Sequence, residues 1–503
     1  MATQTTSPLP STVDVVVVGA GTAGSVVAGR LLERGDRSVL VVESGPDYGA
    51  HGSSGWPADL LDATTLPLSH DWGYSGPGDS GRLLTFDRAR VIGGCSTHNG
   101  CSQSVGWVGD YDAWAAAGLT GWSAAEFRRH LNAASERMRV TRYSDDQVQP
   151  LQRAFIAASV AAGLPRRDDL DDLDGAAGVD VAPVNIVDGQ RWNAAFAYLD
   201  PVRASPRATV SALTTVSRVL VEAGRVTGVE VIRDGQVHRV GCGLVVLSAG
   251  VYGTPEVLLR SGIGDSEELR SHGVDVISHL PGVGRNLHDH PMVSLEFDAS
   301  AELVGLLESF RATTGWLPEE QSVAKASSSV ASGPFDLHLY PWVEPRADSP
   351  HGWAVVLPAA LLTPRSRGSL TLDRSDPMAA STPDHRYLSD PHDVVALSDG
   401  LDLLAGLAAD PSLAPLLGRR LNPQKPNEGR EAWVRRTHSH YWHPAGTAAM
   451  GLDPAHAVTA PTGRVHGIDG LVVADASLFP SVPRSTPALP VVALGELVAS
   501  AIP

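Results

Sequence analysis

The sequence predicts a mixed fold, in which an α/β domain with a parallel sheet alternates along the chain with an α+β domain built on an antiparallel sheet. Three observations predict it. The chain opens on a strand, a glycine-rich turn and a helix; another buried strand occurs at 244–247; and the stretch 300–375 changes to the alternating pattern of antiparallel strands. Because the two patterns interleave, we expect two discontinuous domains within the 503 residues.

The first element pair is a strand and helix that begin a βαβ unit. Val13–Val18 is β-branched and almost wholly apolar, as a strand buried on both faces should be. Apolar residues then keep helical spacing until Arg34–Gly35, and Ser38–Glu43 is a second buried strand. Further elements follow: helices at Glu126–Arg137, Leu151–Gly163 and within 391–439, strands at Thr209–Val221, Val226–Arg233 and Leu244–Leu247, and an extended excursion over 46–90.

The turn after the first strand carries Gly19, Gly21 and Gly24 in the spacing G-x-G-x-x-G. Such glycines allow a tight turn, close approach of the backbone to a pyrophosphate, and close packing of helix on strand. Glu43 ends the second strand about 20 residues later, where an acid that binds a ribose is expected. The motif predicts a Rossmann-like dinucleotide-binding domain and does not separate NAD from FAD.

Composition excludes several classes of protein. The 39 basic and 56 acidic residues give a net charge of −17, which argues against nucleic acid or an anionic membrane as partner. Three cysteines without a C-x-x-C pair indicate neither a disulfide framework nor a metal site. Residues 1–12 are rich in Ser, Thr and Pro, so we expect a mobile tail rather than a secretory signal, and a cytoplasmic protein of open oligomeric state.

Four later segments carry further motifs, and the first of them, Arg88–Gly100, contains paired glycines. Paired glycines followed by small polar residues suit a backbone pressed against a flat ligand. The segments are Arg88–Gly100 (RARVIGGCSTHNG), 248–264 (SAGVYGTPEVLLRSGIG), 441–447 (YWHPAGT) and 470–480 (GLVVADASLFP).

Together with 283–290 (VGRNLHDH), these segments resemble the glucose–methanol–choline (GMC) oxidoreductase family, in family order over residues 13–499. The likeness is greatest to choline oxidases and actinobacterial sugar oxidases. It implies an FAD-binding domain over 13–155, 205–300 and 445–503, and a substrate domain over 156–204 and 301–444. It also implies these FAD contacts: Gly19, Gly21 and Gly24 at the pyrophosphate, Glu43 at the ribose, Val216 at the adenine, Gly94, Ser96 and Asn99 beside the isoalloxazine, Asp475 and Ala476 at the ribityl end, and Pro487 near the pyrimidine.

His98 falls where choline oxidases attach FAD covalently through a histidine. Two interpretations stay open at this position. Either the flavin is linked to His98, or His98 packs noncovalently near the ring.

The resemblance also implies the chemistry, which is oxidation of an alcohol to a carbonyl with transfer of a hydride to flavin N5. His443, in Trp442-His443-Pro444, matches the family's catalytic histidine, and a histidine suits proton removal because its pKa is near neutrality. The family's second His or Asn is replaced by Thr486, which either orients the substrate hydroxyl or marks a specialised enzyme. Gly100, where the family often has serine, is expected to leave room for a bulky substrate or for oxygen.

Several alternatives concern the substrate and the reaction. Trp442 can form one wall of a cage for a quaternary ammonium, but Leu60–Ala63 lacks the expected second tryptophan. We therefore expect a sugar, glycoside, polyol or secondary-metabolite alcohol, with oxygen or another electron acceptor, and keep a choline-type substrate as the alternative. A lyase-like flavoprotein, an NAD-dependent dehydrogenase and a non-catalytic binding protein are the other hypotheses.

Overall fold

A parallel sheet of five strands forms one half of the molecule. The computed structural model describes residues 8–373, 376 and 378–503. The strand order is β22 (Leu471–Val473), β12 (Leu244–Leu247), β1 (Val15–Val18), β2 (Val39–Val42) and β8 (Ala208–Ser211), with every neighbouring pair parallel. The order places the first strand of the chain in the centre, beside strands from the middle and the end of the sequence. This confirms the predicted Rossmann-like domain.

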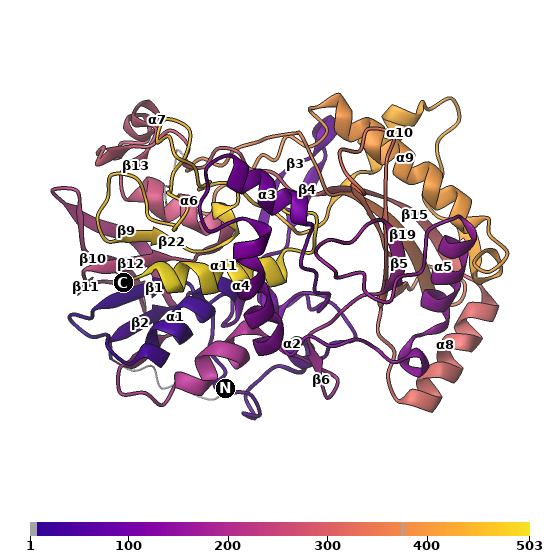
Figure 1. The fold of residues 1–503 in the computed structure, drawn as a ribbon, viewed down its shortest axis with the longest axis horizontal. Coiled ribbons are helices and arrows are strands. Elements are labelled where there is room, and N and C mark those ends of the chain that lie inside the picture. Colours follow the sequence, from indigo (N-terminus) through magenta and orange to yellow (C-terminus); the bar gives the residue numbers. More distant parts are fainter. Residues whose placement is uncertain (1–7, 374–375, 377) are drawn as a thin grey trace.

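Helices from both ends of the chain cover this sheet. The helix α1 (Thr22–Arg34) packs against α11 (Ala488–Ala501), and α11 also packs against α4 (Ala124–Arg137). All three lie in the same half of the molecule as β1 and β2 (Figure 1). The buried residues Val26, Val27 and Leu31 of α1 keep the predicted helical spacing, so burial of this face explains the pattern.

An antiparallel sheet of eight strands forms the other half. Its main path runs β20 (Leu417–Arg420), β15 (Pro291–Ala299), β19 (Trp353–Leu361), β17 (Leu337–Leu339), β16 (Ser322–Ala326) and β5 (Gly178–Val181). The strand β18 (Trp342–Pro345) pairs with β19, and β21 (Ser439–His440) pairs with β15. The helix α9 (Pro391–Ala408) packs on β15 and β19, while α5 (Pro150–Ala161) and α8 (Ala301–Thr314) lie beside each other further out (Figure 1).

The remaining elements are short or peripheral. A three-stranded antiparallel sheet joins β9 (Thr214–Glu222), β10 (Arg225–Arg233) and β11 (Gln236–Gly241). The rest are α2 (Ala58–Leu61), β3 (Tyr74–Pro77), β4 (Leu83–Phe86), α3 (Val108–Ala116), β6 (Ile186–Val187), β7 (Gln190–Arg191), α6 (Gly250–Arg260), β13 (Ile263–Gly264), α7 (Ser266–Ser271), β14 (Ser278–His279) and α10 (Arg430–Thr437).

Two sequence predictions differ from the structure. The predicted strand Thr209–Val221 is two strands of different sheets, because the chain turns at Leu213, whose φ is 52°. The stretch 300–375, expected to be strand-like, begins with α8. Sheet membership also assigns residues 291–299 to the antiparallel sheet, so a domain boundary drawn by strand pairing would fall near residue 290.

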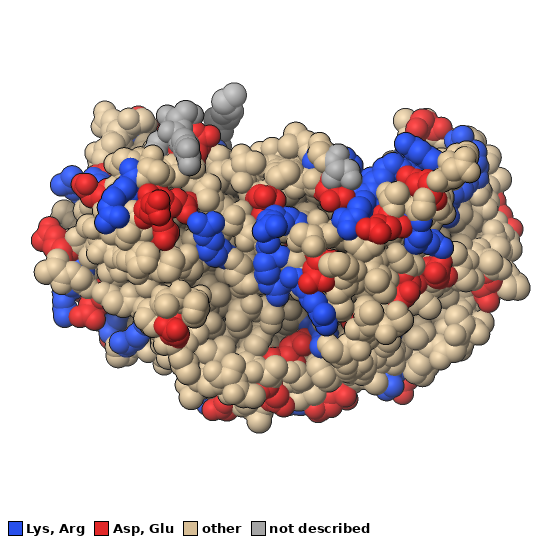
Figure 2. Space-filling model, turned by 90° about the horizontal axis from the view of Figure 1, so that it is seen from above, with Lys and Arg blue, Asp and Glu red and all other residues tan. Residues whose placement is uncertain are grey.

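The surface charge, the helices and the N-terminal tail can each be compared with the sequence predictions. On the face shown in Figure 2, acidic and basic side chains are interspersed, and no large patch of one sign is visible. No helix within the described residues has the length and apolar character that a membrane crossing needs. Of the predicted tail, residues 1–7 lie outside the described residues. Ser11 is held in the fold, because its carbonyl accepts the Gly241 N–H (2.9 Å).

Candidate active site

A cavity of about 490 Å³ is lined by residues from both sheets. It brings together residues that are distant in the sequence, and all but one of the predicted site residues border it. Those that do are Gly19, Gly21, Glu43, Gly94, Ser96, His98, Asn99, Gly100, Val216, Trp442, His443, Asp475, Ala476, Thr486 and Pro487. The predicted residue that does not border the cavity is Gly24.

Gly24 allows close packing in the first turn of α1. A Cβ atom at this position would lie 1.9 Å from the Gly19 carbonyl oxygen, so any side chain would push the helix away from the turn. Gly19 itself has φ 92°, and its Cβ would lie 2.5 Å from the Ser248 carbonyl oxygen. The glycine motif therefore has the two packing functions expected of it, and the space beside Gly21 stays open to the cavity.

Three helices begin at the cavity, and in none of them does the residue before the helix provide a capping side chain. They are α1 after Gly21, α6 after Ala249 and α11 after Pro487. In α6 the first N–H is already bound, because Gly250 donates to the Asp475 carboxylate (3.0 Å), so the open N-termini are those of α1 and α11. Uncapped helix N-termini present N–H groups and partial positive charge, which suits the phosphates of a dinucleotide. The donor set at this part of the cavity thus fits a pyrophosphate.

Glu43 follows β2 and borders the cavity near Val216 of β9. Its carboxylate accepts the N–H groups of Ala20 (2.9 Å) and Gly45 (2.7 Å). Burial raises the pKa of Glu43, and these two bonds oppose that shift because they favour the ionised form. The carboxylate therefore also fixes the glycine turn, beyond the ribose contact that the sequence predicts.

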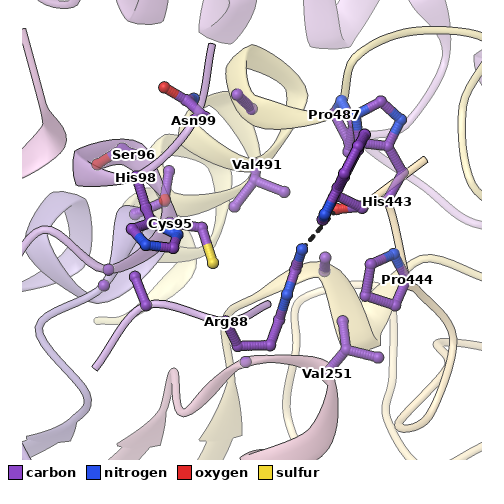
Figure 3. A pocket seen from close by; sticks show the side chains of 18 of the residues that line it. Arg88, Cys95, Ser96, His98, Asn99, Val251, His443, Pro444, Pro487 and Val491 are labelled. Atoms are coloured by element: carbon purple, nitrogen blue, oxygen red, sulfur yellow. Dashed lines mark hydrogen bonds between the residues drawn. The ribbon is translucent and has the colours of Figure 1, made fainter. Parts of the chain in front are cut away.

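Ser96, His98 and Asn99 lie together on one side of the cavity, opposite His443 (Figure 3). The Ser96 hydroxyl donates to the Gly93 carbonyl (2.6 Å), which fixes the turn that carries all three. The Nε2 of His98 lies 2.9 Å from the Ser69 carbonyl oxygen, so this nitrogen carries the hydrogen. Burial lowers the pKa of His98, which leaves the ring neutral with a lone pair on Nδ1.

His443 is held by two neighbours at the start of β15. Its backbone N–H donates to Asp289 Oδ1 (2.9 Å), and its Nδ1 lies 3.1 Å from Nδ1 of His290. Burial, followed by His290 and Arg88, holds the pKa of His443 well below its usual value, so the ring is neutral. No hydrogen-bond partner for its Nε2 occurs among the described residues, and this nitrogen stays available to a ligand.

Asp289 and His290 are residues of the site to which sequence reasoning gave no function, although the 283–290 segment contained them. They meet His443 because β21 pairs with the start of β15, with Pro291 opposite His440. Burial raises the pKa of Asp289 to about 7 and lowers that of His290 to about 3.

Arg88 is another residue that the sequence left without a function. Its guanidinium lies between the His98 side and the His443 side of the cavity (Figure 3) and donates to the Trp442 carbonyl (3.0 Å). It adds positive charge beside the neutral His443. The signal for Arg88 was its place at the head of the 88–100 segment.

Thr486 and Trp442 border the cavity with their polar groups already engaged. The Thr486 hydroxyl donates to the Ser102 carbonyl (3.3 Å). The Trp442 indole N–H donates to Asp87 (3.2 Å), and the residue has φ 60°, a conformation that is uncommon outside glycine. Both side chains are therefore fixed in place.

The cavity also has lining residues that belong to none of the predicted site residues. His338 of β17 borders the cavity, and neither of its ring nitrogens has a hydrogen-bond partner among the described residues. The same holds for Gln103 Oε1 and Ser104 Oγ. Glu320 places its carboxyl beside Gly100, so the room that we expected this glycine to leave for substrate or oxygen is taken by Glu320.

Comparison with known proteins agrees with this geometry. Two family models described as GMC oxidoreductase match residues 13–292 and 364–495. A GMC-type oxidoreductase of Mycobacterium tuberculosis, itself named uncharacterized, is 35% identical over 97% of this chain and 99% of its own. Choline oxidase of Arthrobacter globiformis is 31% identical, over 97% of this chain and 94% of its own.

A solved structure shares the whole fold. Pyridoxine 4-oxidase from Mesorbium loti superposes with a TM-score of 0.85 at 28% identity, covering 97% of this chain and 99% of that one. The glycine turn, the helix N-termini that begin at the cavity and the family models point to the same cofactor, FAD. The chain therefore belongs to the GMC oxidoreductase family and is an FAD-dependent oxidoreductase.

Proposed function

We propose that the chain oxidises an alcohol to a carbonyl compound and that His443 Nε2 takes the hydroxyl proton. One observation carries the proposal: a neutral His443, engaged at Nδ1 and free at Nε2, borders the same cavity as the predicted cofactor residues. FAD, when bound, accepts the hydride. For Nε2 to hold a lone pair, Nδ1 must carry the hydrogen and donate it to His290 Nδ1. His290 is then a positioning residue, which selects the basic tautomer of His443.

Thr486 and Trp442 orient the substrate in this proposal. Because the Thr486 hydroxyl donates to Ser102, its oxygen is left as an acceptor for the substrate hydroxyl. It cannot relay a proton as a second histidine would. Trp442, fixed by Asp87, forms an apolar wall beside His443.

The polar lining favours a substrate with several hydroxyl groups. His338, Gln103 and Ser104 each have a buried polar atom without a partner in the described chain, and buried polar atoms gain when a ligand pairs with them. A sugar, glycoside or polyol meets this need better than a simple apolar alcohol, and a secondary-metabolite alcohol with several hydroxyls does so equally. Oxygen or another acceptor reoxidises the cofactor.

A choline-type substrate is the second candidate. It is favoured by the 31% identity to choline oxidase and by the aromatic rings of Tyr340, Tyr441 and Trp442 along the cavity.

The test is anaerobic reduction of the bound flavin by a panel of alcohols, sugars, glycosides and choline, followed by absorbance. With the best substrate, His443→Ala should reduce the flavin about 10²- to 10⁴-fold more slowly, which is the usual contribution of a general base. The matched control is His456→Asn, because His456 is an exposed surface histidine. If His443→Ala reduces the flavin at the wild-type rate, the proposal is wrong. If no alcohol bleaches the flavin, a non-redox reaction such as a lyase takes its place.

A further inference from the structure

Glu320 carries a carboxyl group at the cavity for which the described residues provide no positively charged partner. The residue lies in the loop between α8 and β16 and is half-buried. Among the described residues, neither a hydrogen-bond donor nor a cation pairs with its carboxylate, although the residue borders the cavity. We propose that Glu320 binds a protonated primary or secondary amino group of the substrate.

Gly100 is the sequence feature that makes room for this carboxyl. A Cβ atom at residue 100 would lie 2.3 Å from Glu320 Oε1 and 3.2 Å from its Cδ. Any side chain there would displace Glu320, because 2.3 Å is far below van der Waals contact. Asn99, a predicted flavin neighbour, precedes Gly100 in the chain and borders the same cavity. The carboxyl thus stands close to the segment expected to flank the flavin, where the substrate must lie.

The electrostatics around Glu320 favour a cation from outside. Burial, and then the neighbouring Glu319, raises the pKa of Glu320 to about 7. The one lysine that lines the cavity among the described residues, Lys325, donates its ammonium hydrogen to the Leu170 carbonyl (2.6 Å). A ligand cation would offset the repulsion from Glu319 and hold Glu320 in its ionised form.

The absence of N–H donors to Glu320 in the described chain decides which kind of cation fits. An ammonium group with N–H bonds can donate charge-assisted hydrogen bonds to a carboxylate, whereas a quaternary ammonium cannot. Tyr340 and Tyr441 stack 4.8 Å apart at the cavity and offer further attraction to a cation. The inference rests on the proposed function and deepens it: the substrate is an amino-bearing alcohol, such as an amino sugar or amino glycoside.

The experiment titrates the FAD-loaded enzyme with n-butylamine hydrochloride, butan-1-ol and tetramethylammonium chloride, and follows the flavin absorbance. The wild type should bind n-butylammonium at least about tenfold more tightly than either other probe. Glu320→Gln should remove this preference. The matched control is Glu319→Gln, because Glu319 also has a pKa raised to about 7 but does not border the cavity. Gly100→Ala should weaken binding of n-butylammonium without removing a charge.

Two results would overturn the inference. One is equal affinity of the wild type for n-butylammonium and butan-1-ol. The other is equal loss in Glu320→Gln and Glu319→Gln, which would show a general effect of negative charge. The alcohol panel reports the proposed function separately. If an alcohol reduces the flavin but the amine preference is absent, only the inference fails; if the preference is present and no alcohol reduces the flavin, only the proposed function fails.

Discussion

Replacing His290 by leucine tests whether this residue selects the basic tautomer of His443. The variant leaves the Nδ1–H of His443 without its partner at 3.1 Å, in a buried place. An unpaired buried donor costs about 1–3 kcal/mol, so the ring gains by moving its hydrogen to Nε2, which faces the cavity. The tautomer with a basic Nε2 then becomes about 5- to 150-fold rarer, and the rate of flavin reduction falls by the same factor.

The assay is stopped-flow reduction of the flavin under anaerobic conditions, over a range of substrate concentrations. The limiting rate should fall while the apparent substrate affinity changes little, because His290 is not among the residues that border the cavity. His290→Asn is the matched variant, since its amide oxygen can accept the Nδ1–H and should restore part of the rate. A wild-type rate in His290→Leu, together with a slow His443→Ala, would refute the tautomer argument. Equal losses in the Leu and Asn variants would assign the effect to packing.

Three further predictions concern pH, the glycine turn and the flavin linkage. The pKa of His443 is held well below its usual value, so the base is already deprotonated near neutral pH. The value of kcat/KM for a neutral alcohol should therefore stay level from about pH 8 to about pH 6. A fall with an apparent pKa near 6.5 would contradict this expectation. Gly24→Ala should lose bound FAD, because its Cβ would lie 1.9 Å from a carbonyl oxygen, whereas Gly305→Ala, with nothing within 4 Å, should keep the wild-type ratio of absorbance at 450 nm to that at 280 nm. Acid precipitation should leave a colourless pellet, because His98 Nε2 already donates to Ser69, and a yellow pellet would indicate a link through Nδ1.

The parallel half of the fold was predictable because its strands β1, β2 and β12 are short runs of buried apolar residues and a glycine turn follows β1. Leu244–Leu247 appears at the predicted residues, and β1 lies within the predicted Val13–Val18. The sequence could not show that Thr209–Val221 divides between two sheets, because a turn at Leu213 carries no glycine, proline or asparagine to mark it. Single non-glycine residues with positive φ interrupt strands without a sign in the composition.

The candidate site likewise contains residues that the sequence indicated and residues that it did not. The residues predicted to contact the cofactor lie in short local motifs. Spacing therefore pointed to the glycine turn, and paired glycines together with the family resemblance pointed to the 88–100 segment. Other groups that line the cavity come from strands and loops of the antiparallel half. Glu320 and His338 belong to no motif, and only strand pairing brings them to the cavity that holds His443. The sequence therefore predicted the chemistry better than the specificity.

Three helices that start at the cofactor part of the cavity come from the beginning, the middle and the end of the chain. The last of them, α11, packs on α1, and β22 completes the sheet beside β12. During synthesis, the ribosome releases this segment last, so a nascent chain cannot offer the finished binding site while it grows. We therefore expect FAD to bind only after synthesis of the chain is complete. A chain that stops before residue 470 should be degraded by proteases and should show no activity.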